Sequence, residues 1–369
     1  MMLPTVSVII PSYNHEKFIQ ECIQSVLDQT YQDFEIVITD DCSSDRSVEL
    51  IQSFDDSRIK LFRHLENKGA SFATNSCILN SSGKYIAMLS SDDAWYPDKL
   101  ALQVKYLEEH PEIAAVFGKV DWIDENGDEI LYKNFPYLDV FNVRNRTRHE
   151  WLKHFFFYGN CLCHPSSLIR KECYTKVGML NPTLAGLPDY DLWIRFSLKY
   201  EIRILNNKMV RYRWVGDTDN TSGDTNSNRI RNRFECFKIL DNYLKIADLS
   251  EFLLIFPEAT KYGKVVAGLI PYYLGRMAIE SGPEYKVLWG LGIISDLLQN
   301  QGLAEILEEK YDFSFTSFIK FSSMYDVFKI TSGGQDLSIP YRSRFRSFLS
   351  ASKRYAKEIY LLMKKSPEN

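Results

Sequence analysis

Two adjacent aspartates, Asp92 and Asp93, are the residues of this sequence best suited to chemistry. They follow Tyr85–Leu89, an apolar run long enough for a strand buried on both faces and too short for a helix. Trp95 and Pro97 then open a helical pattern, with the proline at a first-turn position. Carboxylates at the carboxyl end of a buried strand lie where open α/β sheets bind ligands, and two that repel each other favour a bound cation. The alternative is a solvated turn that caps the next helix.

Short β-rich runs alternate with helical patterns over residues 5–120, and each helical pattern has apolar residues three and four apart. Such alternation predicts right-handed βαβ units on a mostly parallel sheet flanked by helices. The expected strands are Val6–Ile10, Glu35–Thr39, Ile59–Phe62, Tyr85–Leu89 and Ala114–Phe117, and the expected helices are Lys17–Gln29, Ser47–Phe54, Ser71–Asn80 and Lys99–Glu109.

The simple alternation ends at an Asn-Gly turn within Asp124–Glu129. Residues 150–215 mix the two kinds of element, and the polar stretch Gly216–Asn228 is a loop by composition. Beyond about Arg229 the pattern is almost wholly helical. We therefore expect an α/β domain over residues 1–225 and a helical region over residues 226–369. The mixed segment is expected to hold helices His149–Tyr158, Lys171–Val177 and Asp189–Lys199, and strands Ser166–Ile169 and Ile202–Tyr212.

The last predicted helix, Tyr341–Lys365, is basic and amphipathic, with eight lysines and arginines against one acid, Glu358. Helices of this type lie on anionic membrane surfaces. Docking of the same helix on its own protein is an equally good interpretation. The sequence thus leaves both a peripheral membrane contact and an internal contact open.

Composition bounds the class of protein. A chain of 369 residues suggests two domains, or one with a large extension, and 45% hydrophobic residues can fill a core. The net charge of −4 gives no general electrostatic reason to bind nucleic acid. Seven cysteines without a regular framework indicate reduced thiols in a cytosol, and the amino terminus lacks a signal-peptide pattern. The longest apolar run, Val265–Gly275, is too short to span a bilayer, so we expect a soluble or peripheral protein.

Polar groups follow the first four predicted strands, at one edge of the sheet. Tyr13 is flanked by small polar residues and can stack on a planar base. A carboxylate such as Asp41 could accept a hydrogen bond from a base, although capping of the next helix by Ser44 or Asp45 competes. The four stretches are Pro11-Ser12-Tyr13-Asn14, Thr39 to Asp45, Asn67-Lys68-Gly69 and Ser90-Ser91-Asp92-Asp93.

In this order, the stretches resemble the family-2 glycosyltransferases, and the opening VSVIIPSYNHEKFIQECIQSVLDQTYQDFEIVITDDCSSDRS follows that family's pattern almost throughout. The resemblance covers roughly residues 5–222 and implies a GT-A, nucleotide-sugar-binding, Rossmann-like fold. It implies that Tyr13 packs on the nucleobase and that Asp41 bonds its edge. Asp92 would face the ribose or the metal shell, and Asp93 would ligate Mn²⁺ or Mg²⁺ at the donor diphosphate.

Two positions depart from the family pattern. Ser90 stands where the family often has a third acid, and the remaining two carboxylates should suffice for a metal, with weaker affinity. Thr74 stands where an arginine often precedes the asparagine of the next helix, which removes one phosphate or base contact.

The second half of the expected site opens the helix at Asp189. On a helix, Asp189 and Asp191 lie roughly 200° apart, so one cleft cannot receive both. Trp193 marks the buried side, which leaves Asp189 better placed to project into a cleft and Asp191 to cap the helix or pair with a cation. Without the resemblance, two acids here would simply favour the helix dipole. The resemblance implies that Asp189 is the catalytic base, with Pro188 in place of the usual glutamate.

His164, with cysteines nearby, suggests a zinc site, but its ligand spacing is wrong and it crosses an apparent strand. The resemblance places His164 on the acceptor side of the cleft, where we also assign Trp193 and Asp191. It further implies that Arg213, with its neighbours Arg211 and Trp214 and with Ser222, lies near the diphosphate; a plain pair of arginines on a strand edge is the alternative.

The leading hypothesis is transfer of a sugar, with inversion, from a nucleotide-diphosphate donor, preferably a UDP-sugar, to an acceptor hydroxyl. The resemblance implies a glycan or lipid-linked glycan acceptor, in bacterial lipopolysaccharide or capsule synthesis at the inner face of the cytoplasmic membrane. A nucleotidyltransferase should have a glycine-rich, basic loop after the first strand, and a nicotinamide enzyme should have Gly-x-Gly-x-x-Gly; neither is present. A non-catalytic carbohydrate-binding module would be expected to lose Asp92, Asp93 and Asp189.

Overall fold

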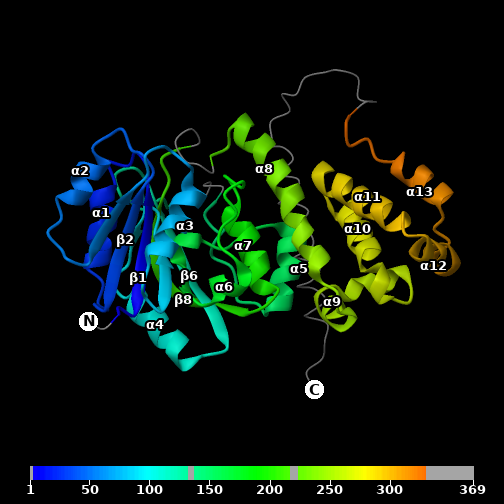
Figure 1. Cartoon of the computed structure of the whole chain (residues 1–369), viewed down its shortest axis with the longest axis horizontal. Coiled ribbons are helices and arrows are strands. Elements are labelled where there is room, and N and C mark those ends of the chain that lie inside the picture. The colour runs from blue at the N-terminus through cyan, green and yellow to red at the C-terminus, as the bar shows by residue number, and fades with distance from the viewer. Residues whose placement is uncertain (1–2, 132–136, 217–222, 330–369) are drawn as a thin grey trace. The chain divides into compact units, whose positions relative to one another are not determined.

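The computed structural model describes residues 3–131, 137–216 and 223–329. Ser222 and the predicted basic helix Tyr341–Lys365 lie outside these residues. An eight-stranded sheet holds the first part of the chain together, in the order β3-β2-β1-β4-β7-β6-β8-β5 (Figure 1). The strands are β1 (Val6–Ser12), β2 (Phe34–Asp40), β3 (Ile59–Arg63), β4 (Tyr85–Met88), β5 (Ala94–Trp95), β6 (Ile113–Ile123), β7 (Leu168–Arg170) and β8 (Glu201–Arg213).

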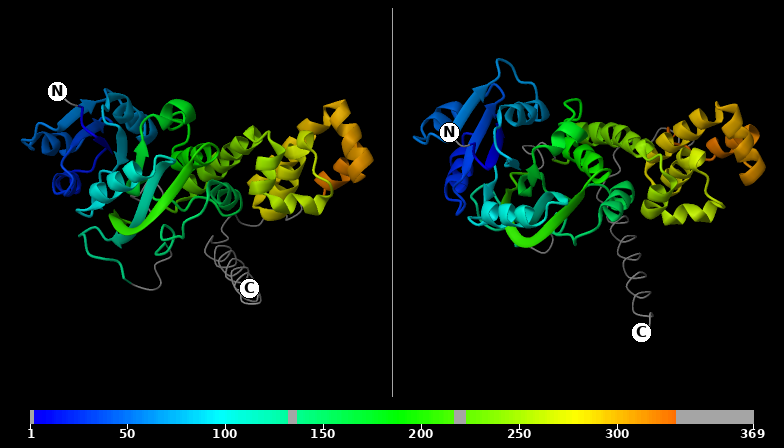
Figure 2. Two further views of the ribbon diagram at one scale, coloured as in Figure 1. Left: turned by 90° about the horizontal axis from the view of Figure 1, so that it is seen from below. Right: turned by 60° about the horizontal axis from the view of Figure 1, so that its bottom comes forward.

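The sheet is mostly parallel, as predicted. Strands β1 to β4 are parallel to one another, and β6 is parallel to β8. Strand β7 is antiparallel to both β4 and β6, and β5 is antiparallel to β8. Figure 2 shows β8 as a long, curved strand beside β6. Because β8 is long enough to reach β5, it brings the far end of the sheet back to the Asp92–Asp93 turn.

Helices cover the sheet where the apolar patterns predicted them. Four residues of α1 and three of α4 are buried in one core cluster with residues of β1, β2, β4 and β6. Burial of these side chains supplies the main driving force for this layer, at about 25 cal/mol per Å² of apolar surface. The helices up to β8 are α1 (Ile19–Leu27), α2 (Ser47–Gln52), α3 (Ala70–Asn80), α4 (Lys99–Glu109), α5 (Arg148–Tyr158), α6 (Cys173–Val177) and α7 (Pro188–Ser197).

Two sequence predictions in this region were wrong. Trp95 does not begin a helix: with Ala94 it pairs with β8, and α4 begins only at Lys99. Ser166 is not in a strand but in a 3-10 turn, η1 (His164–Ser166), and β7 starts two residues later. At Trp95, pairing with the distant β8 outweighs the local pattern. At Ser166, a local hydrogen bond from its N–H to the carbonyl oxygen of Cys163 closes the 3-10 turn.

The described part of the chain after residue 225 is helical, as predicted, and up to Ser322 it forms one compact unit with the sheet. The boundary at residue 225 therefore marks a change of secondary structure, and a domain boundary there stays a prediction. The described elements of this region are α8 (Asn226–Ile239), η2 (Leu240–Lys245), α9 (Leu249–Ile255), η3 (Pro257–Tyr262), η4 (Ala267–Leu269), α10 (Ile270–Ser281), α11 (Glu284–Leu298), α12 (Gln301–Tyr311) and α13 (Phe315–Ser322). None of the described helices is long and apolar enough to cross a membrane.

Helices α10 and α11 approach each other closely at two glycines. A Cβ atom added to Gly290 would lie 2.5 Å from the carbonyl oxygen of Gly275, and one added to Gly275 would lie 2.9 Å from the carbonyl oxygen of Gly290. The two backbones therefore meet with no room for a side chain between them.

Candidate active site

The Asp92–Asp93 turn presents one buried carboxylate and one more accessible one. Asp93 is 2% exposed, and its Oδ1 accepts the backbone N–H of Arg213 at 2.8 Å. Its Oδ2 is buried and has no hydrogen-bond partner among the described residues. Burial, followed by the charge of Asp92, raises the pKa of Asp93 well above its usual value. Asp92 itself is partly exposed. The turn thus holds an unsatisfied oxygen beside a second carboxylate.

Arg213 is the residue that fixes this turn. Its guanidinium is almost fully buried; Nε donates to the carbonyl oxygen of Asp92 at 2.7 Å, and Nη1 donates to that of Asp124 at 2.9 Å. It also pairs with Glu21 of α1. Arg213 therefore ties the aspartate turn to the predicted Asn-Gly turn, which does form, with Gly127 donating to Asp124. The structure gives Arg213 a supporting role, and a direct contact with a diphosphate stays a prediction.

The loop after β1 carries the residue expected to stack on a base. Tyr13 is 45% exposed, so one face of its ring is free of the core. Before it, Pro11 and Ser12 end β1, and the Ser12 hydroxyl is buried with no partner among the described residues. Asn14 adopts a left-handed conformation with φ of 52° and accepts the N–H of Ser44 at 2.8 Å. The loops after β1 and β2 are thus joined beneath Tyr13.

Asp41 is 2% exposed and already holds the neighbouring turn. Its carboxylate accepts the backbone N–H of Lys68 at 3.0 Å and of Gly69 at 2.7 Å, and His64 Nδ1 lies 2.7 Å from it. Gly69 has a φ of 90°, which favours glycine there, and opens α3. Asp41 therefore positions the Asn67–Gly69 turn, and a bond to a base would have to share one of its oxygens. Sequence reasoning missed His64, which carries no local signal.

Asp189 lies in the first turn of α7 and is partly buried. Its Oδ2 accepts Nδ2–H of Asn160 at 2.8 Å. Burial raises the pKa of Asp189 to about 6. This carboxylate is therefore ionised at neutral pH, yet is a stronger proton acceptor than an ordinary aspartate. Asn160, in the loop after α5, was not found from the sequence.

Asp93 and Asp189 both influence the pKa of two buried side chains, Cys163 and Tyr212. The charges of both carboxylates raise the pKa of the Cys163 thiol and of the Tyr212 hydroxyl, after burial as the main cause. Charges interact appreciably only within about 10 Å in solution, somewhat farther in a protein interior. Both carboxylates therefore lie close enough to Cys163 and Tyr212 for their charges to be felt there.

The residues assigned to the acceptor side, Asp191, His164 and Trp193, contact other side chains of the protein itself. Asp191 is 7% exposed; it pairs with Arg195 at 2.8 Å and accepts from Asn242 at 2.7 Å. His164 meets the edge of the fully buried Trp193 ring at 5.1 Å between centroids. Burial lowers the pKa of His164 to about 4, and its Nε2 has no partner among the described residues. The described residues contain no cluster of three metal-binding side chains, so the structure does not support zinc at His164.

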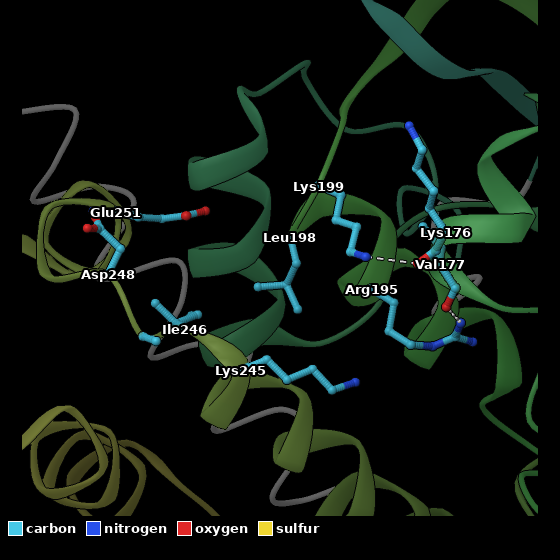
Figure 3. A pocket seen from close by; sticks show the side chains of 10 residues that line it. Lys176, Val177, Arg195, Leu198, Lys199, Lys245, Ile246, Asp248 and Glu251 are labelled. Atoms are coloured by element: carbon cyan, nitrogen blue, oxygen red, sulfur yellow. Dashed lines mark hydrogen bonds between the residues drawn. The ribbon is translucent and has the colours of Figure 1, made fainter. Parts of the chain in front are cut away.

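Two cavities lie away from these residues. One of about 470 Å³ is lined by cationic side chains such as Arg195 and Lys245 and, on its other side, by Asp248 and Glu251 (Figure 3). The other, of about 600 Å³, lies against the end of α3 and the start of α6, with Leu79 and Tyr174 in its wall. Neither is lined by Asp92, Asp93 or Asp189, so neither encloses the candidate active site.

Comparison with known proteins agrees with this geometry. The family model described as Glycosyl transferase family 2 matches residues 7–171. The uncharacterized glycosyltransferase MJ1057 of Methanocaldococcus jannaschii is 31% identical over 222 residues, which are 59% of this chain and 73% of that protein. The Escherichia coli UDP-Glc:alpha-D-GlcNAc-diphosphoundecaprenol beta-1,3-glucosyltransferase WfgD is 41% identical over 121 residues, 33% of this chain and 47% of WfgD.

A solved structure shares the fold over most of the chain. Staphylococcus aureus TarS 1-349 in complex with UDP-GlcNAc superimposes with a TM-score of 0.55 at 17% identity, covering 90% of this chain and 93% of that one. This likeness confirms the expected α/β, GT-A class of fold with a helical carboxyl-terminal region. With the family model and the MJ1057 alignment, it shows that this chain belongs to glycosyltransferase family 2.

Proposed function

We propose that this glycosyltransferase is an inverting enzyme that moves a sugar from a nucleotide-diphosphate donor to the hydroxyl of an acceptor glycan. The observation that supports the proposal is the buried Asp93 carboxylate with an unpartnered oxygen, together with Asp189, whose charge acts on the same Cys163 and Tyr212 as that of Asp93. A UDP-sugar is the favoured donor, since the structural neighbour TarS binds UDP-GlcNAc and WfgD is named for UDP-Glc.

Asp189 is the proposed base. As the acceptor oxygen forms its bond to the anomeric carbon, the bond from that carbon to the diphosphate oxygen breaks, and the hydroxyl proton passes to Asp189. Attack from the face opposite the leaving group inverts the configuration. The pKa of about 6 keeps the carboxylate ionised near pH 7 and raises its basicity. The Asn160 amide holds one oxygen, and so fixes the direction of the other.

Asp92 and Asp93 are the residues that would hold Mn²⁺ or Mg²⁺. The unpartnered Oδ2 of Asp93 and the accessible carboxylate of Asp92 fit a hard cation that takes oxygen ligands. Two protein carboxylates with substrate phosphates completing the shell is a usual arrangement for such cations. When bound, the cation would offset the negative charge on the departing diphosphate. Arg213 keeps both carboxylates at the end of the sheet.

The nucleotide and the acceptor would occupy opposite sides of this region. Tyr13 offers an exposed ring for the base, and Lys68 and Gly69 line the turn that Asp41 holds. On the acceptor side, the buried Trp193 of α7 would support His164, whose ring packs against it. WfgD is named for a diphosphoundecaprenol-linked acceptor, which favours a lipid-linked glycan in surface polysaccharide synthesis at the inner membrane face. Membrane contact through Tyr341–Lys365 is part of this proposal, and packing of that helix on the protein is the alternative.

The first experiment compares Asp189→Asn with Asp191→Asn, a neighbour on the same helix. A thermal-shift screen of nucleotide sugars with Mn²⁺ identifies the donor, because a ligand that binds only the folded state raises its stability. With that donor, Asp189→Asn should bind normally and lose about 10²–10⁴-fold in transfer. Asp191→Asn should lose stability first and keep most of its turnover. Unchanged transfer by Asp189→Asn, or loss of turnover only in Asp191→Asn, would show that the base is misassigned.

The same screen separates the enzyme from a binding module. Slow hydrolysis of the donor that depends on Mn²⁺ is the result expected for a transferase. Sugar binding without Mn²⁺-dependent donor turnover would favour the carbohydrate-binding module, and formation of a nucleotide sugar from a sugar phosphate would favour the nucleotidyltransferase.

A further inference from the structure

Glu235 makes a set of contacts directly before the helix that carries Asp189. It lies on α8, is 1% exposed, and accepts three consecutive backbone N–H groups: Ala185 at 2.8 Å, Gly186 at 3.0 Å and Leu187 at 2.7 Å. Residue 188, which follows them, begins α7. A side chain 46 positions after Asp189 in the sequence therefore holds the segment that leads into its helix.

This arrangement follows from the needs of a helix amino terminus. The first N–H groups of a helix have no partner within it, and the partial positive charge there favours an anion. Pro188 at the first helical position has no N–H, and Glu235 accepts the N–H of the N-cap residue Leu187 and of the two residues before it. A buried carboxylate is costly unless hydrogen bonds replace its water, and these N–H groups supply them. Arg231 of the same helix also pairs with this carboxylate, with Nε 3.6 Å from Oε1.

Gly186 allows α8 to approach this closely. A Cβ atom at residue 186 would lie 2.2 Å from Oδ1 of Asn232 and 3.5 Å from Oε2 of Glu235. The α8 helix thus lies directly against the loop, and the carboxylate of Glu235 and the first turn of α7 form one rigid contact.

Glu235 also acts on Asp189 through its charge. The pKa of Asp189 is raised mainly by burial, and the negative charge of Glu235 adds to this effect. Two further titratable groups that feel the charge of Asp189 are Cys163, in the segment before η1, and Tyr212 of β8; burial raises the pKa of both, so both stay uncharged.

We propose that Glu235 is a positioning residue for the candidate base: by holding the N–H groups of residues 185–187, it fixes where the first turn of α7 presents Asp189. This proposal rests on the proposed role of Asp189 as the base. It gives α8 a function in the reaction, although this helix lies outside the stretch matched by the family model. A displacement of a catalytic group by about 1 Å can cost about 100-fold in rate, so such a support matters for turnover.

Two substitutions separate position from charge. Glu235→Gln removes the charge and turns an acceptor oxygen into an amide that opposes the N–H groups. We expect kcat to fall about 10–100-fold, with the KM for the donor unchanged, and the acid limb of the kcat/KM profile to move to lower pH. Glu235→Asp keeps the charge but reaches less far, so kcat should fall while the acid limb stays in place.

Glu258→Gln is the matched control, because it removes one partner of the Lys153–Glu258 ion pair, 2.7 Å long, away from α7. It should leave kcat and the pH profile unchanged. A purely structural role for Glu235 would lower the melting temperature and the active fraction of Glu235→Gln while leaving kcat per active site and the acid limb at wild-type values. That result would overturn the proposal.

Amide hydrogen exchange tests the contact independently of the base assignment. In Glu235→Gln, the amides of residues 185–187 should exchange faster than in the wild type, while amides of β1 and β2 stay protected. Unchanged protection at residues 185–187 would contradict the contact itself. If Asp189→Asn retains full transfer, the base assignment is at fault, whereas the exchange result still reports on the tie to Glu235.

Discussion

Arg213 and Asp93 lie 120 positions apart in the sequence, yet the backbone N–H of Arg213 donates to Asp93 Oδ1 at 2.8 Å. The same arginine reaches the carbonyl oxygens of Asp92 and Asp124 with its side chain. The acidic turn that is expected to bind the donor has one local hydrogen bond, from the N–H of Asp93 to the carbonyl oxygen of Ser90. The last residue of β8 adds the bonds that tie both aspartates to the sheet.

The first prediction concerns this arginine. Arg213→Met should lower the free energy of unfolding by about 3 kcal/mol, because buried carbonyl groups lose their donors, and should abolish Mn²⁺-dependent binding of UDP. Urea unfolding and calorimetric titration measure the two effects. Arg211→Met is the control, since Arg211 is more exposed and bonds Gly127 and Glu21 without touching the aspartate turn. Equal losses of UDP binding in both variants would argue against a specific role for Arg213.

The second prediction is a trade-off at Asp93. Without metal, Asp93→Asn should be as stable as the wild type or more so, because it removes a buried charge that Asp92 repels. The variant should lose the rise in melting temperature that Mn²⁺ with UDP gives the wild type, and should lose turnover. Asp128→Asn, at an exposed position of the neighbouring turn, should keep both. A full Mn²⁺ response in Asp93→Asn would exclude this carboxylate as a ligand.

The third prediction is the pH dependence of transfer. Asp189 must be ionised to accept a proton, and burial raises its pKa to about 6. Below that pH, kcat/KM should fall about tenfold for each pH unit, and above it the profile should level off. The measurement is an initial-rate series at saturating Mn²⁺, with stability checked at each pH. A flat profile between about pH 4.5 and 7.5, the range that brackets this pKa, would mean that Asp189 does not act as the base.

The fourth prediction uses two glycines of the same helix. Gly290→Ala should lower the free energy of unfolding by about 1–3 kcal/mol, because its Cβ would lie 2.5 Å from the carbonyl oxygen of Gly275. Gly292→Ala is the matched control: nothing lies within 4 Å of its added Cβ, so the change should raise stability by up to about 1 kcal/mol through helix propensity. Denaturant unfolding of the two variants measures the difference. Equal effects would show that α10 and α11 do not meet at this point.

The alternation of apolar runs was enough to predict most of the sheet. Lys99–Glu109 was predicted with the bounds of α4, and Tyr85–Leu89 differs from β4 by one residue. The helix has an apolar face at helical spacing and the strand is a short continuous apolar run, so the local sequence predicts both. Trp95 is different, because its two-residue strand forms by pairing with β8. The local sequence contains no pattern that predicts this pairing.

The candidate site was predictable where a strand ends in chemically active residues, as at Asp92 and Asp93. The residues that hold the candidate site in place could not be predicted. Asn160 bonds Asp189 from a loop, and Glu235 holds the segment before it from a helix; both are distant in the sequence, and a single amide or carboxylate has many other uses. Periodicity reports which face is buried; it says nothing about which distant backbone a buried side chain will hold.

The role of β8 also has a consequence for how the protein is made. The stretch matched by the family model ends at residue 171, before β8 begins at Glu201. On the ribosome, the first four strands can emerge and fold while the acidic turn still lacks the N–H that will hold it. A nascent chain therefore carries a Rossmann-like half whose acidic turn, the proposed cation site, gains its last support only after some 120 further residues have been translated.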